Sequence, residues 1–200
     1  MNKQLLVDHL LFEVSPRQIT ESLAENNGKL IVRGVLQRAE AKNQNERVYP
    51  KEVLMREAKK YNTLIKERRA LGELDHPESS VVNLNNVSHN VLEMSWNGND
   101  LVGKVEVLPT PSGNILKSLF QSGIKLGISS RGMGSVKEVM REGNNTLEVQ
   151  PDFELVAFDF VSNPSTHGAF LSPVNESVNK VISKKYEKVE NIISKIIREF

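Results

Sequence analysis

The sequence predicts an α+β fold in which helices surround a small, mostly antiparallel, barrel-like β-sheet. Two observations support this prediction. Short runs of alternating or β-branched apolar residues, typical of strands, recur at residues 29–39, 81–93, 100–108, 126–130, 135–140, 147–150 and 153–161. Helical periodicity is confined to a few segments, and the clearest covers residues 50–69.

Length and composition indicate one globular domain with extensions. The chain has 200 residues, of which 38% are hydrophobic and 26% charged. The formal net charge is only +1, so the chain lacks the overall positive charge that would predict binding to nucleic acid. The absence of cysteine excludes disulfides, thiolate metal sites and a cysteine nucleophile, and it suits a protein used in a cytoplasm.

The order of elements divides the chain into three parts. Residues 1–27 predict an amphipathic amino-terminal arm that ends in an Asn-Asn-Gly turn, and residues 28–172 hold the main domain. Within that domain, Pro50 opens a helix and residues 97–100 (NGND) form a hairpin turn. Residues 173–200 predict an amphipathic carboxy-terminal helix, and no apolar run is long enough to cross a membrane.

The segment at residues 125–135 (KLGISSRGMGS) holds the most informative candidates for chemistry. Side chains alternate along a strand, so Ser129 and Ser130 point to opposite faces. Gly127 lies on the Ser129 face and leaves room for a substrate backbone, which makes Ser129 the better candidate nucleophile and Ser130 the alternative.

The residues after the two serines are candidates for stabilising an oxyanion. Arg131 offers a cation, and Gly132 offers an unobstructed backbone N–H group. The alternative is a strand that ends in a glycine-rich turn, with serines that bond only to nearby backbone.

A serine needs a base, and His76 is the best candidate. It lies before Pro77 in an acidic segment, where it could accept a proton from the nucleophile. Two alternatives stay open at this point. One is an ordinary surface histidine, and the other is a metal site built from Glu73, Asp75, His76, Glu78 and His89.

The third candidate segment is residues 153–165, an apolar strand that carries Asp159. A carboxylate in such a run must be paired or lie at a rim, so Asp159 could orient His76. It could equally cap the turn that follows the strand. His167, just beyond that turn, is a second candidate for the orienting role.

Together these segments resemble the prohead core protease family of T4-type tailed phages. The resemblance covers roughly residues 32–172. It depends on the order and spacing of five motifs at residues 45–50 (NERVYP), 72–77 (GELDHP), 96–100 (WNGND), 127–135 (GISSRGMGS) and 159–164 (DFVSNP).

This resemblance implies a serine endopeptidase with a fold like the herpesvirus maturation protease, a small barrel surrounded by helices. It implies Ser129 as nucleophile and His76 as base, with Asp159 as the third member, and no metal or cofactor. The implied substrates are the scaffold and core proteins of the prohead, the major capsid protein and the enzyme itself. The implied location is the prohead interior, in the cytoplasm of a bacterial host.

The resemblance also implies cleavage after glutamate, with an aliphatic residue two positions earlier. Matching tripeptides end at Glu13, Glu25 and Glu199, so we expect self-processing to remove part of the amino-terminal arm. The carboxy-terminal helix carries an apolar stripe of Val178, Ile182, Val189, Ile192, Ile193 and Ile196. This stripe could pack on the enzyme's own core or form a homo-oligomer contact.

Overall fold

The computed structural model describes residues 3–141 and 143–162. The helices are α1 (Pro16–Glu25), α2 (Lys51–Lys66) and α3 (Pro111–Gln121), with a short 3-10 helix η1 (Leu84–Asn86). The strands are β1 (Gln4–Phe12), β2 (Ile31–Arg38), β3 (Arg47–Val48), β4 (Leu71–Glu73), β5 (Val87–Asn97), β6 (Asp100–Val107), β7 (Leu126–Gly134), β8 (Val136–Arg141), β9 (Asn144–Val149) and β10 (Glu154–Val161). Mixed helices and strands confirm the predicted α+β class.

The strands form three sheets that are mostly antiparallel. Their orders are β1-β7-β10, β2-β6-β5-β4 and β3-β9-β8, and only the short β3–β9 pair among them is parallel in the described chain. An isolated parallel bridge between Leu74 and Phe160 joins the end of β4 to β10. The hydrogen-bonded pairs of the described residues give three separate sheets and no closed ring of strands.

Local signals account for several elements. The predicted hairpin is present, because Asn97 pairs with Asp100 and Gly98 adopts φ +59°, which glycine tolerates without steric cost. Helix α2 begins one residue after Pro50, which lies at the N-cap position. Helix α3 starts earlier than its apolar stripe indicates, because the Thr110 side chain accepts a hydrogen bond from the Gly113 N–H group.

The amino-terminal segment differs from the amphipathic arm that the sequence predicts. Residues 4–12 form the strand β1, which pairs with the whole length of β7. Leu6 and Phe12 are buried on the face that points into the core, and α1 follows after Ser15 and Gln18 form a capping box. The nine paired residues of β1 therefore belong to the sheet that holds the candidate serines.

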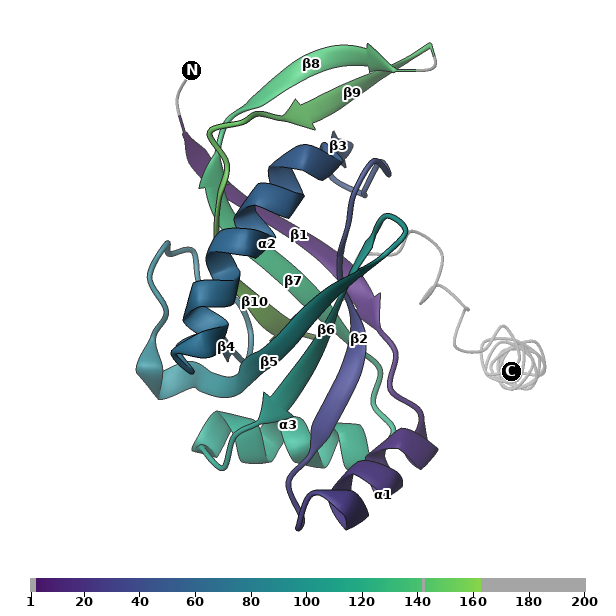
Figure 1. Cartoon of the computed structure of the whole chain (residues 1–200), viewed down its shortest axis with the longest axis vertical. Coiled ribbons are helices and arrows are strands. Elements are labelled where there is room, and N and C mark those ends of the chain that lie inside the picture. Colours follow the sequence, from purple (N-terminus) through teal and green to yellow (C-terminus); the bar gives the residue numbers. More distant parts are fainter. Residues whose placement is uncertain (1–2, 142, 163–200) are drawn as a thin grey trace, which may run out of the picture. The chain divides into compact units, whose positions relative to one another are not determined.

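The β1-β7-β10 sheet positions the site. Figure 1 shows β7 between β1 and β10, with the β8–β9 hairpin at one end of the described part of the chain and α1 and α3 at the other. The main core contains Ile128, Phe158 and Phe160 together with residues of β2, β5 and β6. One face of β7 therefore packs into the core, and the other face is left for the site.

Candidate active site

Ser129 and Ser130 lie at the middle of β7 on opposite faces. Both are buried, but their hydroxyl groups differ. The Ser130 Oγ accepts a hydrogen bond from Gln37 Nε2 at 2.8 Å and donates to the Asp8 carbonyl oxygen at 3.5 Å. The Ser129 Oγ has no hydrogen-bond partner among the described residues. Of the two hydroxyl groups, Ser129 is thus the one that no described residue pairs with.

The strand register places a histidine and a carboxylate on either side of Ser129. His9 of β1 and Asp159 of β10 are its direct cross-strand partners. Directly opposed residues in antiparallel strands project to the same face, with Cβ atoms about 4.5–5.5 Å apart. His9, Ser129 and Asp159 therefore form one row on this face, which we call the Ser129 face.

His76 reaches the same face from the loop after β4. The Asp75 N–H group donates to the Phe160 carbonyl oxygen at 2.7 Å, which ties the loop to β10. The ring centroid of His76 lies 5.2 Å from that of His9, with 37° between the ring planes. The structure therefore brings the candidate base next to the direct neighbour of the candidate nucleophile.

Sequence reasoning did not identify His9. Its only local signal is a histidine that interrupts an apolar run near the amino terminus. Its neighbours Ser129 and His76 come from distant segments, so only the pairing of β1 with β7 reveals its position.

Arg131 is the centre of a buried ion-pair network on the Ser129 face. Its Nε atom donates to Asp159 Oδ2 at 2.7 Å, and its Nη2 atom donates to Glu73 Oε1 at 2.9 Å. Its Nη1 atom donates to the carbonyl oxygens of Ser79 at 2.6 Å and Val81 at 3.4 Å. The side chains of the three ionised residues are fully buried. Arg131 thereby holds the segments before and after His76.

Asp159 is engaged in this network. Its Oδ1 atom also accepts the Glu73 N–H group at 3.0 Å, and no hydrogen bond between Asp159 and His76 is among those of the described residues. Burial raises the pKa of Asp159 although its bonds to Arg131 act in the opposite direction. The hydrogen bonds of the Asp159 carboxylate in the described structure are thus with Arg131 and Glu73.

Gly132 lies in close contact with β10 and the residue before it. A Cβ atom at this position would come within 2.5 Å of the Phe153 ring and 2.6 Å of the Glu154 carbonyl oxygen. Close packing alone therefore explains why glycine is needed there.

The structure does not support the metal site that the sequence allowed. His89 points into the core, where its Nδ1 atom lies 2.8 Å from Ser88 Oγ and its Nε2 atom 2.9 Å from the Phe158 carbonyl oxygen. Burial lowers the pKa of His89 to about 4. Glu73 pairs with Arg131, and the described residues contain no group of three histidine or acidic side chains that could hold a metal ion.

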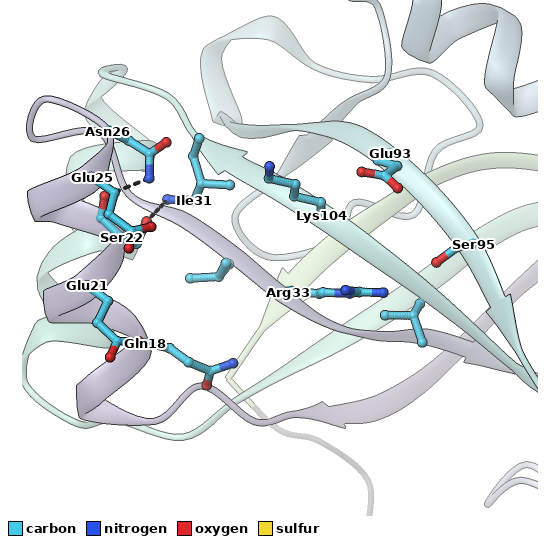
Figure 2. A pocket seen from close by; sticks show the side chains of 12 residues that line it. Gln18, Glu21, Ser22, Glu25, Asn26, Ile31, Arg33, Glu93, Ser95 and Lys104 are labelled. Atoms are coloured by element: carbon cyan, nitrogen blue, oxygen red, sulfur yellow. Dashed lines mark hydrogen bonds between the residues drawn. The ribbon is translucent and has the colours of Figure 1, made fainter.

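A cavity of about 390 Å³ lies away from these residues, between α1 and the strands β2, β5 and β6. Figure 2 shows Glu21 and Glu25 of α1 on one side, with Arg33, Glu93 and Lys104 on the strands. Neither Ser129 nor His76 lines it. This cavity therefore does not belong to the candidate site.

Two predicted features lie outside the described residues: His167 and the carboxy-terminal helix at residues 173–200. Within the described ranges, no helix is both long enough and apolar enough to cross a membrane.

Comparisons with known proteins agree on one group of relatives. Residues 9–179 match the family model described as prohead core protein serine protease. The chain is 34% identical over 148 residues to the prohead core protein protease of Enterobacteria phage T4, an alignment that covers 72% of this chain and 68% of that protein. The solved structure of the bacteriophage T4 capsid assembly protease matches with a TM-score of 0.68 and 30% identity, and covers 80% of this chain and 99% of that one.

Proposed function

The chain belongs to the prohead core protein serine protease family, and we propose that it is a serine endopeptidase of phage prohead maturation. In this role it digests the internal scaffold and core proteins and trims capsid proteins, including the major capsid protein. The observation that carries the proposal is the buried Ser129 hydroxyl, which has no hydrogen-bond partner in the described structure and lies in one row with His9, whose ring contacts His76.

The proposed reaction begins when the Ser129 Oγ attacks the scissile carbonyl carbon. His76 accepts the hydroxyl proton as the new C–O bond forms and then gives it to the leaving amine as the C–N bond breaks. Water, activated by the same histidine, hydrolyses the acyl-enzyme and releases the second product. No metal or cofactor takes part in these steps.

Arg131 and the Gly132 backbone are the proposed stabilisers of the oxyanion. The Arg131 guanidinium already donates to Asp159, Glu73, Ser79 and Val81. Arg131 reaches an oxyanion only when Nη1 exchanges its weakest contact, at 3.4 Å from the Val81 carbonyl oxygen, for the substrate.

Asp159 is the proposed orienting carboxylate of the site. Its contacts support an indirect action, because it holds the Glu73 N–H group and the Arg131 side chain. Both of these groups fix the ends of the segment that carries His76.

We propose that cleavage follows glutamate and that the enzyme processes itself. Glu13 is exposed in the connection between β1 and α1, and Glu25 is exposed at the end of α1, so both can be reached from solvent. Glu199 lies outside the described residues. Intact-mass analysis of active protein beside a Ser129→Ala variant tests this step, and identical amino termini in the two would contradict it.

The herpesvirus-protease-like barrel also belongs to the proposal. The Leu74–Phe160 bridge joins two of the sheets, and one core cluster contains residues of β1, β2, β5, β6, β7 and β10. Both features support a sheet that wraps around one core. We place the enzyme in the prohead interior within the bacterial host.

The decisive experiment incubates the purified protein with a peptide that contains Ile-x-Glu. Cleavage after glutamate is expected for the wild type and not for Ser129→Ala or His76→Ala. Loss of activity with a chelator would instead indicate a metal-dependent hydrolase. Equal behaviour of all three proteins, on this peptide and in self-processing, would indicate a scaffold or assembly component without catalysis.

A further inference from the structure

Strand β1 occupies the edge of β7 that an extended substrate would need. It pairs with β7 from Gln4 to Phe12, and His9 lies opposite Ser129, which has no exposed surface. The other edge of β7 is paired with β10. The proposed self-processing removes β1, because Glu13 follows the last residue of this strand. Cleavage there therefore frees the β7 edge beside the proposed nucleophile.

The side chain of Asp8 on β1 lies in a pocket built for a carboxylate. Its Oδ1 atom accepts hydrogen bonds from Asn45 Nδ2 at 2.6 Å and Arg47 Nη1 at 3.1 Å, and its Oδ2 atom accepts one from the Tyr49 hydroxyl. Burial and the charge of Asp8 raise the pKa of Tyr49 well above its ordinary value, so this hydroxyl remains a donor. Three donors, one of them a cation, make this buried pocket selective for an acidic side chain.

Two of the same residues also hold the backbone of β1. Asn45 Nδ2 donates to the Val7 carbonyl oxygen at 2.9 Å, and Arg47 Nη1 donates to it at 3.3 Å. Backbone contacts of this kind bind an extended peptide whatever its side chains are. Asn45 and Arg47 therefore recognise both an extended strand and the acidic residue that it carries.

An apolar pocket receives the residue two positions before Asp8. Leu6 lies on the same face of β1 as Asp8, because side chains alternate along a strand, and it is fully buried. The other buried members of its core cluster are Ala39, Tyr49, Val53, Leu54, Val149 and Phe153. Strand β1 thus presents an aliphatic and an acidic side chain with one residue between them, which is the spacing of the proposed cleavage motif.

The strand register places the peptide bond after Asp8 next to Ser129. Asp8 lies opposite Ser130, and His9 lies opposite Ser129. A peptide in the place of β1, with glutamate at the position of Asp8, would present the bond after this glutamate to Ser129. Glu13 lies four residues beyond His9, about 13 Å along an extended chain. Strand β1 is therefore not bound in the register in which it would be cut after Glu13.

We propose that β1 is a pseudosubstrate, which occupies the binding site for an extended peptide that carries an aliphatic residue two positions before glutamate. This inference rests on the proposed function. Removal of the amino-terminal arm frees β7, and the substrate adds to it as a strand. Its glutamate enters the pocket of Asn45, Arg47 and Tyr49, and its aliphatic side chain takes the place of Leu6. Transient opening of β1 supplies the small active population that begins processing.

The side chain of Asp8 distinguishes the pseudosubstrate from a substrate. Aspartate is one methylene shorter than glutamate, so β1 does not carry the residue that the proposed cleavage rule requires at this position. The Arg47 Nε atom is buried and has no hydrogen-bond partner in the described structure. It is a further donor for a longer acidic side chain.

Two peptides that differ in one group test the carboxylate pocket. The enzyme, incubated until its intact mass is constant, should cleave an Ile-x-Glu peptide faster than an Ile-x-Gln peptide. Arg47→Met is expected to lower kcat/KM about 10- to 100-fold for the glutamate peptide and less than about threefold for the glutamine peptide, because the cation acts on the charge. In the matched control Arg141→Met, the arginine pairs with Glu40 and Glu148, and neither value should change more than about twofold.

Tyr49→Phe covers the case in which Arg47→Met does not fold. It removes the hydroxyl donor and keeps the ring that packs against Phe153. The preference for the glutamate peptide over the glutamine peptide is expected to fall about 10-fold. A purely structural role of Arg47 or Tyr49 would instead lower the cleavage of both peptides equally.

A second measurement returns β1 to the processed enzyme. A synthetic peptide of residues 1–13 is expected to inhibit competitively against the Ile-x-Glu peptide. Asp8→Asn in this inhibitor should raise its inhibition constant about 10- to 100-fold, because the ion pair with Arg47 is lost. Val7→Ala, at a side chain on the opposite face of the strand, should change the constant less than about threefold.

The outcomes separate this inference from the proposed function. If the wild type does not cleave the glutamate peptide, or if Ser129→Ala cleaves it equally well, the proposed function fails. If only Ser129→Ala is inactive, the inference fails when Arg47→Met and Tyr49→Phe keep the preference for glutamate within about threefold, or when residues 1–13 do not inhibit. It also fails if a chain that retains residues 1–13 cleaves the peptide as fast as the processed enzyme does.

Discussion

Ser129 and Ser130 are joined by one peptide bond and are equally buried, yet their surroundings differ. On the core side of β7, Ser130 bonds to Gln37 and to the Asp8 backbone. On the other side, the Ser129 hydroxyl is unpaired in the described structure and lies beside His9. The same residue type is thus hydrogen-bonded on one face of the strand and left without a described partner on the other, where we propose the nucleophile.

The histidines show the same contrast. Both ring nitrogens of His89 have hydrogen-bond partners in the core. On the Ser129 face, His9 and His76 each keep an Nδ1 atom that no described residue pairs with. For these serines and histidines, the groups in the core are hydrogen-bonded, whereas those on the Ser129 face keep a buried atom without a partner in the described structure.

The largest expected effect tests this contrast directly. Ser129→Ala is expected to lower peptide cleavage by about 10³-fold or more, because the nucleophile is lost. The melting temperature should not fall, since Ser129 Oγ has no partner in the described structure. Peptide hydrolysis and thermal unfolding measure the two quantities, and a destabilised but active variant would contradict the assignment.

The second effect concerns the network that holds the His76 segment. Arg131→Met, made in the Ser129→Ala protein to prevent self-digestion, is expected to lower the free energy of unfolding by about 3–5 kcal/mol. It leaves Asp159 and Glu73 as buried carboxylates without their cation. Urea unfolding gives the value.

The matched control for this change is Arg38→Met. Arg38 also pairs with a carboxylate on a neighbouring strand, Asp100, but half of its side chain is exposed, at 51%. The expected cost is therefore at most about 1 kcal/mol. If both variants lose the same free energy of unfolding, the buried Arg131 network contributes no more to stability than an exposed ion pair does.

The third effect is a pH dependence that comes from His89. Its folded pKa of about 4 lies below the ordinary value of 6.5, so the unfolded chain binds the proton more readily. The contribution of His89 to the free energy of unfolding is complete above about pH 6.5. It decreases as the pH falls toward 4, by about 3 kcal/mol in total. Urea unfolding of the Ser129→Ala protein at several pH values should show this slope, and the slope should be shallower with His89→Gln. Equal slopes of stability against pH with and without His89→Gln would show that His89 does not cause this pH dependence.

The smallest effect sharpens the comparison of the two serines. Ser130→Ala is expected to cost about 1–2 kcal/mol of stability, because the buried Gln37 amide loses its partner. Peptide cleavage should stay within about twofold. Ser118→Ala, at an exposed serine of α3, should change stability by less than about 0.5 kcal/mol. A large loss of activity in Ser130→Ala would reverse the roles of the two serines.

Much of the fold could be predicted from local patterns. Alternation identified most strands, the Asn-Gly turn located the hairpin at residues 97–100, and apolar periodicity located α2. Strand parity also separated Ser129 from Ser130, and the structure places their side chains on opposite faces of β7. The strand at residues 4–12 was missed because Leu10, Leu11 and Phe12 are consecutive apolar residues that hide the alternation.

Local sequence was enough to specify the two faces of β7, the family motifs and the nature of the candidate nucleophile and base. Which residues meet at the site depends on the three-dimensional fold. The fold places His9 beside Ser129. It also brings Arg131 into contact with Asp159, Glu73 and the loop after His76. The physical reason is that alternation has a period of two residues and can be seen locally. Cross-strand register, in contrast, depends on the simultaneous packing of segments from opposite ends of the described chain.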